Sequence, residues 1–165
     1  MRWARLPGVK VSDIMTAAAV TDSPGDTLAE AASKMWKEQT GSLLVMEGDQ
    51  LKGIVTERDV LREIGLGRDP KHVSLSDVMT ADPVTISAET SLKEAAEIMF
   101  QKWFRHLPVA SSDGKVVGII SLRDLLTIVA EGMKEPDSLQ PLLGHQLVRD
   151  ARTDRLQHIE AGDLD

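Results

Sequence analysis

Apolar residues recur at helical spacing twice along the chain, in the same order each time. One helix face, at positions i, i+3, i+4 and i+7, is apolar at Leu28, Ala31, Ala32 and Met35. Sixty-four residues later the same spacing is apolar at Leu92, Ala95, Ala96 and Met99. Each stripe follows a Ser/Thr-x-x-Glu capping box, at 27–30 and 91–94. The pattern therefore predicts two equivalent helices that begin at these boxes.

Two compact apolar segments joined by a polar turn follow each predicted helix, as is typical of a β-hairpin. These segments are 43–46 and 51–55 in the first copy, and 107–110 and 116–120 in the second. A short extended segment precedes each helix, at 20–21 and 84–86. A further amphipathic helix follows each hairpin, beginning at Thr56 and at Ser121. The predicted order is β-α-β-β-α, twice.

Direct sequence identity shows that the two copies are a tandem duplication. The segment Ser12-Asp13-Ile14-Met15-Thr16 returns as Ser76-Asp77-Val78-Met79-Thr80, and 53–59 matches 118–124. One such unit is too small to bury its own faces, so we expect the two to pack together around a cleft. The predicted fold is mixed α+β, with two repeats related by a pseudo-two-fold axis. Its expected parts are repeat 1 at 9–66, a linker at 67–74, repeat 2 at 75–131 and an extension at 132–165.

Composition narrows the function classes. The 165 residues include no cysteine, which excludes disulfides, thiol nucleophiles and Cys-based metal sites. The net charge of −7 and the aromatic content of 3 % argue against a nucleic-acid-binding role. The longest apolar stretches are too short to span a bilayer, so we expect a cytoplasmic protein without a membrane segment. Residues 131–165 carry eight acidic and four basic residues, and we expect this acidic extension to be partly helical or disordered.

Catalytic arrangements are not evident in the sequence. The four histidines are scattered without metal-ligand spacing, and there is no Gly-rich phosphate loop. We therefore predict a protein that is not an enzyme and requires no metal and no catalytic cofactor.

The duplicated segment that runs from a strand through Gly to Thr/Ser-x-x-Asp has two interpretations. The first N–H groups of a helix, with the hydroxyl of Thr56 or Ser121, favour a phosphate, and Asp59 or Asp124 is a good acceptor for ribose hydroxyls. The same spacing is also a helix cap that needs no ligand. Arg58 and Arg123 favour the ligand interpretation, because a cation in the first helical turn opposes the helix dipole.

Two further segments are candidate contacts. Arg105 and His106 precede a strand and could neutralise phosphates across the cleft, whereas repeat 1 has Gly41 and Ser42 at these positions. Arg105 and His106 could equally be solvated surface residues. The backbone around Thr80, which leads toward the short extended segment, could approach a base edge or be an ordinary loop.

These motifs together resemble a tandem pair of CBS domains, known as a Bateman module. The resemblance rests on D-[IV]-M-T at the start of each unit, on the A-A-x-x-M helix, on R-H-L-P-V and on G-I-[VI]-[TS]-x-R-D, and it covers about residues 9–130. The family implies a regulatory module that binds AMP, ADP, ATP, S-adenosylmethionine or NAD between the repeats, with or without Mg²⁺. It also implies a disc-shaped homodimer and a regulated partner protein of unknown identity.

The resemblance also implies roles for individual residues. Thr56 and Asp59 would serve one site, and Ser121 and Asp124 the other. The phosphates would be approached by Arg58, Arg105, His106 and Arg123, and the adenine would be bordered by Val20, Leu43, Val84 and Leu107. Gly41-Ser42 in place of Arg105-His106 makes the first site the less complete one. The alternative function is a dimerisation or interaction scaffold whose clefts hold no ligand.

Overall fold

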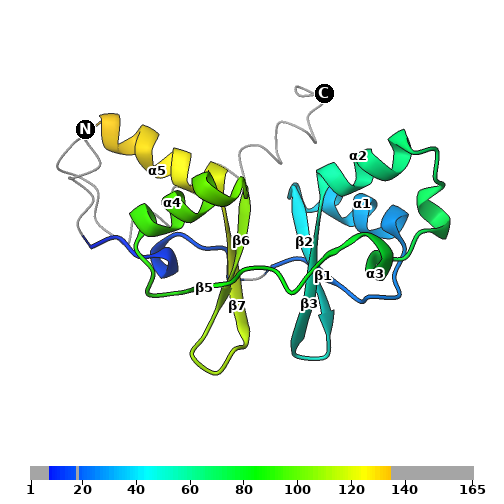
Figure 1. Cartoon of the computed structure of the whole chain (residues 1–165). Coiled ribbons are helices and arrows are strands. Elements are labelled where there is room, and N and C mark those ends of the chain that lie inside the picture. The colour runs from blue at the N-terminus through cyan, green and yellow to red at the C-terminus, as the bar shows by residue number, and fades with distance from the viewer. Residues whose placement is uncertain (1–7, 18, 135–165) are drawn as a thin grey trace.

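The computed structural model describes residues 8–17 and 19–134, which form two halves of the same β-α-β-β-α architecture (Figure 1). The first half contains β1 (Thr21–Asp22), α1 (Leu28–Lys37), β2 (Ser42–Glu47), β3 (Gln50–Thr56) and α2 (Glu57–Gly65). The second half contains β5 (Ile86–Ser87), α4 (Leu92–Lys102), β6 (His106–Ala110), β7 (Val116–Ser121) and α5 (Leu122–Lys134). The predicted element order and the α+β class are confirmed. Of the extension expected at 132–165, the first three residues belong to α5, and residues 135–165 lie outside the described residues.

Helix starts follow the capping boxes that the sequence predicts. The Oγ1 of Thr27 accepts a hydrogen bond from the Glu30 N–H at 3.2 Å, and the Thr27 N–H donates to the Glu30 carboxylate at 2.9 Å. The hydrogen bonds that the Thr27 N–H and the Thr27 hydroxyl donate to the Glu30 carboxylate, at 2.9 Å and 2.7 Å, lower the pKa of Glu30. A lowered folded-state pKa means that this contribution to helix α1 is present at neutral pH and is lost as the pH falls through that value. Ser91 caps α4 by accepting from the Glu94 N–H at 3.2 Å.

The two sheets lie side by side in the middle of the molecule, and the helices cover their outer sides (Figure 1). The first sheet has the order β1-β2-β3-β4, where β4 is Thr80–Ala81, and the second has the order β5-β6-β7. In both, the first pair of strands is parallel and the hairpin pair is antiparallel. A third apolar cluster, formed by Leu44, Ile54 and Ile119, joins the inner faces of the two sheets. The two halves therefore share a buried apolar contact and are not independent domains joined by a linker.

The segment that opens each sequence repeat packs into the opposite half. Val11 and Ile14, in and beside the short 3-10 helix η2 (Val11–Asp13), belong to the core of the second half. Val73, Leu75 and Val78, in and around α3 (Leu75–Val78), belong to the core of the first half. The linker also contains a 3-10 turn, η3 (Pro70–His72). Nothing in the pattern of apolar positions predicts this exchange.

Equivalent backbone hydrogen bonds hold the two leading segments, so each packs into the opposite half in nearly the same way. The Val11 N–H donates to the Thr90 carbonyl at 2.8 Å, and 64 residues later the Leu75 N–H donates to the Asp26 carbonyl at 2.9 Å. At the sheet edges, Thr80 pairs with Ile54 while Thr16 pairs with Ile119. Each Thr/Ser-x-x-Asp motif therefore lies beside a leading segment that comes from the other repeat.

Gly118 and Gly53 stand where these leading segments cross the strands, and their substitution tests the crossing. A Cβ at Gly118 would lie 2.7 Å from the Thr16 carbonyl oxygen, whereas a Cβ at Gly53 would lie 2.5 Å from the flexible Met79 Sδ. We expect Gly118→Ala to lower the free energy of unfolding by about 1–3 kcal/mol, because backbone must move. Gly53→Ala is the matched control, and we expect a smaller loss in urea unfolding because a side chain can rotate away. Equal losses would contradict the tight backbone crossing at Gly118.

Candidate functional site

A cavity of about 650 Å³ lies between the two halves. This volume falls within the range of about 300–1,000 Å³ that small-molecule sites occupy. The first half lines it with the end of α1, the turn before β2 and the start of α2, and the second half with the start of β6, the end of β7 and the start of α5. Because both halves contribute, a molecule bound here would contact both sequence repeats at once.

Ser121 and Asp124 lie on the second-half wall of this cavity. Oδ2 of Asp124 accepts hydrogen bonds from the Ser121 N–H and Oγ, both at 2.8 Å, and the Asp124 N–H donates to Ser121 Oγ at 3.3 Å. The residue Asp124 is 2 % exposed. The helix cap that the spacing alone allows is thus present. Asp124 also lines the cavity, so the cap fixes the position of its side chain on this wall.

Cationic side chains lie on the same wall. Arg105, His106 and Arg123 all line the cavity, and the two arginines are exposed. The Leu122 N–H donates to the Arg105 carbonyl at 2.8 Å, which joins the start of α5 to the turn before β6. Two guanidinium groups beside the start of a helix form a local environment that favours an anion, although the whole chain is acidic.

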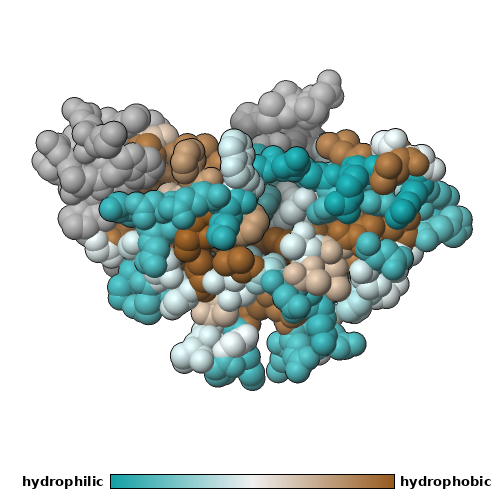
Figure 2. Space-filling model, viewed as in Figure 1, coloured by the Kyte–Doolittle hydropathy of each residue, from teal (hydrophilic) through white to brown (hydrophobic). Residues whose placement is uncertain are grey.

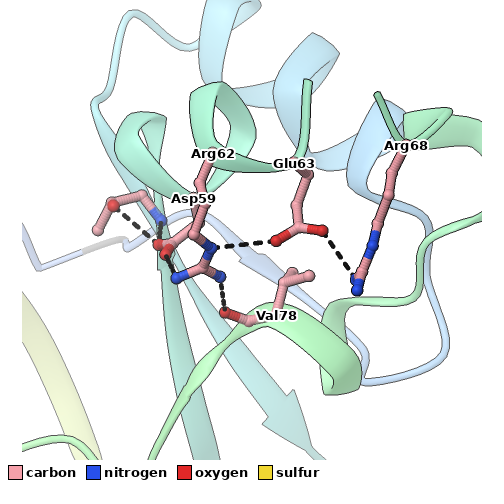
Figure 3. Close-up of polar contacts among 6 residues, drawn as sticks. Asp59, Arg62, Glu63, Arg68 and Val78 are labelled. Carbon is pink, nitrogen blue, oxygen red and sulfur yellow. Dashed lines mark hydrogen bonds and ion pairs between the residues drawn. The ribbon is translucent and has the colours of Figure 1, made fainter. Parts of the chain in front are cut away.

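The first copy of the motif has different partners (Figure 3). Oδ2 of Asp59 accepts from the Thr56 N–H and hydroxyl at 2.8 Å, and Arg62 pairs with Asp59 Oδ1 at 3.4 Å. Nη2 of Arg62 also donates to the Val78 carbonyl at 3.2 Å. Both oxygens of Asp59 are therefore engaged by the protein, and the guanidinium connects α2 to the exchanged segment.

The network continues through a buried acid. Glu63 is 2 % exposed, and its carboxylate forms ion pairs with Nε of Arg62 at 3.0 Å and with Nη1 of Arg68 at 2.9 Å (Figure 3). The second repeat has Thr127 and buried Ile128 at the positions of Arg62 and Glu63. The arginine and glutamate that surround the first motif therefore have no counterparts at these two positions of the second repeat. Asp124 lines the cavity and Asp59 does not, which makes the Asp124 motif the candidate ligand contact.

The predicted site residues divide into several groups in the structure. Five line the cavity: Arg105, His106, Ser121, Arg123 and Asp124. Three lie at the start of α2 and do not line it: Thr56, Arg58 and Asp59. Thr80 and Val84 are exposed and also lie outside the lining, and Val20 lines a separate pocket of about 510 Å³ beside α1.

Leu43 and Leu107, which the resemblance places beside the adenine, do not line the cavity. Each is 0 % exposed and belongs to the helix-facing core of its own half. Successive strand side chains alternate between faces, so it is the neighbouring Leu44 that joins the contact between the two sheets. The side chains of Leu43 and Leu107 therefore stabilise the halves, and neither residue lines the cavity.

Several lining residues are not among those that the sequence singles out. Trp36 is 67 % exposed at the end of α1, and Glu57 begins α2. Ser42 is 2 % exposed, and its Oγ has no hydrogen-bond partner among the described residues. The sequence does offer one signal for Trp36. It is a tryptophan beside the apolar stripe of α1 in a chain with only 3 % aromatic residues.

The described residues contain neither a cluster of metal ligands nor a helix that could cross a membrane. No group of three or more His, Asp or Glu side chains has the arrangement of a metal site in 8–17 and 19–134. Among the helices of that part of the chain, none combines the length and the apolar character needed to cross a bilayer.

Comparisons with known proteins identify the two repeats. The family model of the CBS domain matches residues 11–66 and 75–131. An uncharacterized protein of Methanopyrus kandleri is 33 % identical over 122 residues, which is 73 % of this chain and 62 % of that protein. The CBS domain-containing protein YhcV of Bacillus subtilis is 39 % identical over 116 residues, covering 70 % of this chain and 81 % of the relative. A solved structure of CBSX2 in complex with AMP has a TM-score of 0.64 and 25 % identity, covering 78 % of this chain and all (100 %) of the other.

Proposed function

Because the chain belongs to the CBS domain family, we propose that it is a regulatory module that binds one adenosine-containing ligand in the cavity between its repeats. The observation that carries the proposal is the convergence of Asp124, Arg105 and Arg123 on one cavity. The AMP bound by CBSX2 supports adenosine as the ligand class. The ligand most consistent with the charges present is a nucleoside monophosphate.

The proposed contacts follow from the chemistry of each group. The Asp124 carboxylate, held by Ser121, accepts hydrogen bonds from the ribose hydroxyls. The guanidinium groups of Arg105 and Arg123 bind the phosphate, and His106 adds a further polar contact. The first motif, in which Asp59 is paired with Arg62, supports the fold.

Ligand binding would act by shifting the populations of arrangements of the two halves. Residues from both halves line the cavity, so a bound nucleotide stabilises the arrangements in which both walls can reach it. We propose that this change is transmitted to a second protein, and that the module itself forms a homodimer.

Isothermal titration calorimetry of the purified chain with AMP tests the proposal. We expect saturable binding with one AMP per chain, because one motif has its carboxylate at the cavity and the other has it paired with Arg62. ATP, NAD and S-adenosylmethionine serve as the comparison set. Absence of binding by all four ligands, in protein first denatured and refolded to remove carried-over molecules, would contradict the proposal.

A scaffold without ligand is the second candidate function, and exposed apolar side chains favour it. Leu61, Phe100, Trp103 and Leu126 are between 58 % and 87 % exposed, and apolar surface lies on the helices of both halves (Figure 2). If the chain binds none of the four ligands but is dimeric by light scattering, the scaffold function is the better explanation.

A further inference from the structure

The two walls of the cavity differ in charge, and this difference orients a ligand. The second half contributes Arg105, Arg123 and His106, whereas the described lining of the first half has no basic residue and carries the acid Glu57. The carboxylate of Glu57 lies against Gly41, where a Cβ would be 3.2 Å from its Cδ. The duplication places Arg105 where Gly41 stands and Leu122 where Glu57 stands. A phosphate is therefore attracted to the second half and repelled by the first.

The first-half wall offers a surface suited to the other end of such a ligand. Its apolar members are Ala32, Met35, Trp36, Val60 and Leu61. Of the described residues that line the cavity, Trp36 contributes the one indole or phenyl ring, and it is 67 % exposed. Phe100 stands at the equivalent position of the second half and is 82 % exposed, but it does not line the cavity. The duplication thus leaves an aromatic ring on one wall alone, opposite the cations.

From this arrangement we propose that Trp36 stacks on the base of the bound nucleotide and is the residue that makes the cavity selective for ligands that carry an aromatic ring. Stacking on an aromatic side chain stabilises a bound base because every base has a π-face. The indole lies at the end of α1, whose buried stripe anchors the helix, so the ring is presented on a rigid element. This inference rests on the proposed function, since it assigns the base end of the ligand whose ribose and phosphate contact the second half.

The test separates the base from the sugar phosphate by using two probes. The dissociation constant of AMP, and the inhibition constant of ribose 5-phosphate as its competitor, are measured for the wild type and for Trp36→Ala. We expect Trp36→Ala to weaken AMP about tenfold and to change ribose 5-phosphate less than twofold, because the sugar phosphate makes no stack. Trp36→Phe keeps a ring and should restore most of the affinity. Phe100→Ala is the matched control and should leave both constants unchanged.

Tryptophan fluorescence gives a second measurement on the same proteins. AMP should quench the emission of the wild type, and this change should be lost in Trp36→Phe. Wild-type affinity for AMP in Trp36→Ala, or an equal loss for both probes, would overturn the stacking role while leaving the proposed function intact. A shift of Trp36→Ala from dimer to monomer with unchanged AMP affinity would place the ring in a subunit contact and would also overturn it. Failure of AMP, ATP, NAD and S-adenosylmethionine alike to bind the wild type would instead contradict the proposed function itself.

Discussion

Replacement of Asp124 by Asn is expected to weaken AMP binding by about 100-fold. Hydrogen bonds to a charged acceptor contribute about 1.5–3 kcal/mol each, and the carboxylate can accept from both ribose hydroxyls. Loss of that charge from two bonds amounts to about 3 kcal/mol, which corresponds to roughly two orders of magnitude in dissociation constant. The measurement is calorimetric titration with AMP at fixed ionic strength.

Asp59→Asn is the matched control for that substitution. Asp59 makes the same pair of 2.8 Å hydrogen bonds to the Thr56 N–H and hydroxyl that Asp124 makes to Ser121. It does not line the cavity, and Arg62 is its ionic partner. We therefore expect at least as large a loss of thermal stability in Asp59→Asn as in Asp124→Asn, but a change in AMP affinity of less than about twofold in Asp59→Asn. Equal loss of affinity in the two variants would show that both motifs bind the ligand and would contradict the division of roles proposed above.

Shortening the side chain of Ile14 is expected to destabilise the second half, although this residue belongs to the first repeat in the sequence. Ile14 is 1 % exposed and packs in the core that contains Leu107 and Ile120. Removing a buried Ile side chain to Cβ costs about 2–5 kcal/mol, from lost apolar burial and the cavity left behind. Hydrogen exchange of Ile14→Ala should therefore accelerate in β6, β7 and α4 more than in β2 and β3.

Val78→Ala tests the other leading segment, which belongs to the second repeat and packs in the first half. Val78 is 5 % exposed and belongs to the core of the first half, together with Leu43 and Val55. Hydrogen exchange of Val78→Ala should accelerate first in β2 and β3. The loss of unfolding free energy should be smaller than in Ile14→Ala, because fewer atoms are removed. Faster hydrogen exchange in the first half of Ile14→Ala would mean that each leading segment packs on its own repeat. That result would contradict the packing of each leading segment into the opposite half.

Much of the fold could be predicted because local rules and the duplication agree. The capping boxes at Thr27 and Ser91 begin helices where the spacing places them. The hairpin strands also lie where compact apolar segments indicate them, with β2 and β3 each within one residue of the predicted segments. The short strands β1 and β5 are shifted by one or two residues along the chain, since two-residue strands depend on a partner strand more than on their own sequence.

The site could be predicted only in part. Ser121, Asp124 and Arg105 were recognisable because motif and charge mark them in the sequence, and they do meet at the cavity. Leu43 does not line the cavity, because a single apolar position does not reveal which face of a strand its side chain occupies. Trp36 and Glu57 carry no motif, and their place beside the second-half cations depends on how the halves pack.

The sequence by itself determined that this protein is a duplicated α+β chain, because periodicity, helix caps and direct repeats are local properties that survive in a linear string. Only the tertiary structure decided which leading segment joins which half, since 11–15 and 75–79 are near-copies that could each fill either core. It also decided that the two Thr/Ser-x-x-Asp motifs are not equivalent. Arg62 reaches Asp59 in one half, while the cavity reaches Asp124 in the other, and such partners are brought together only by packing.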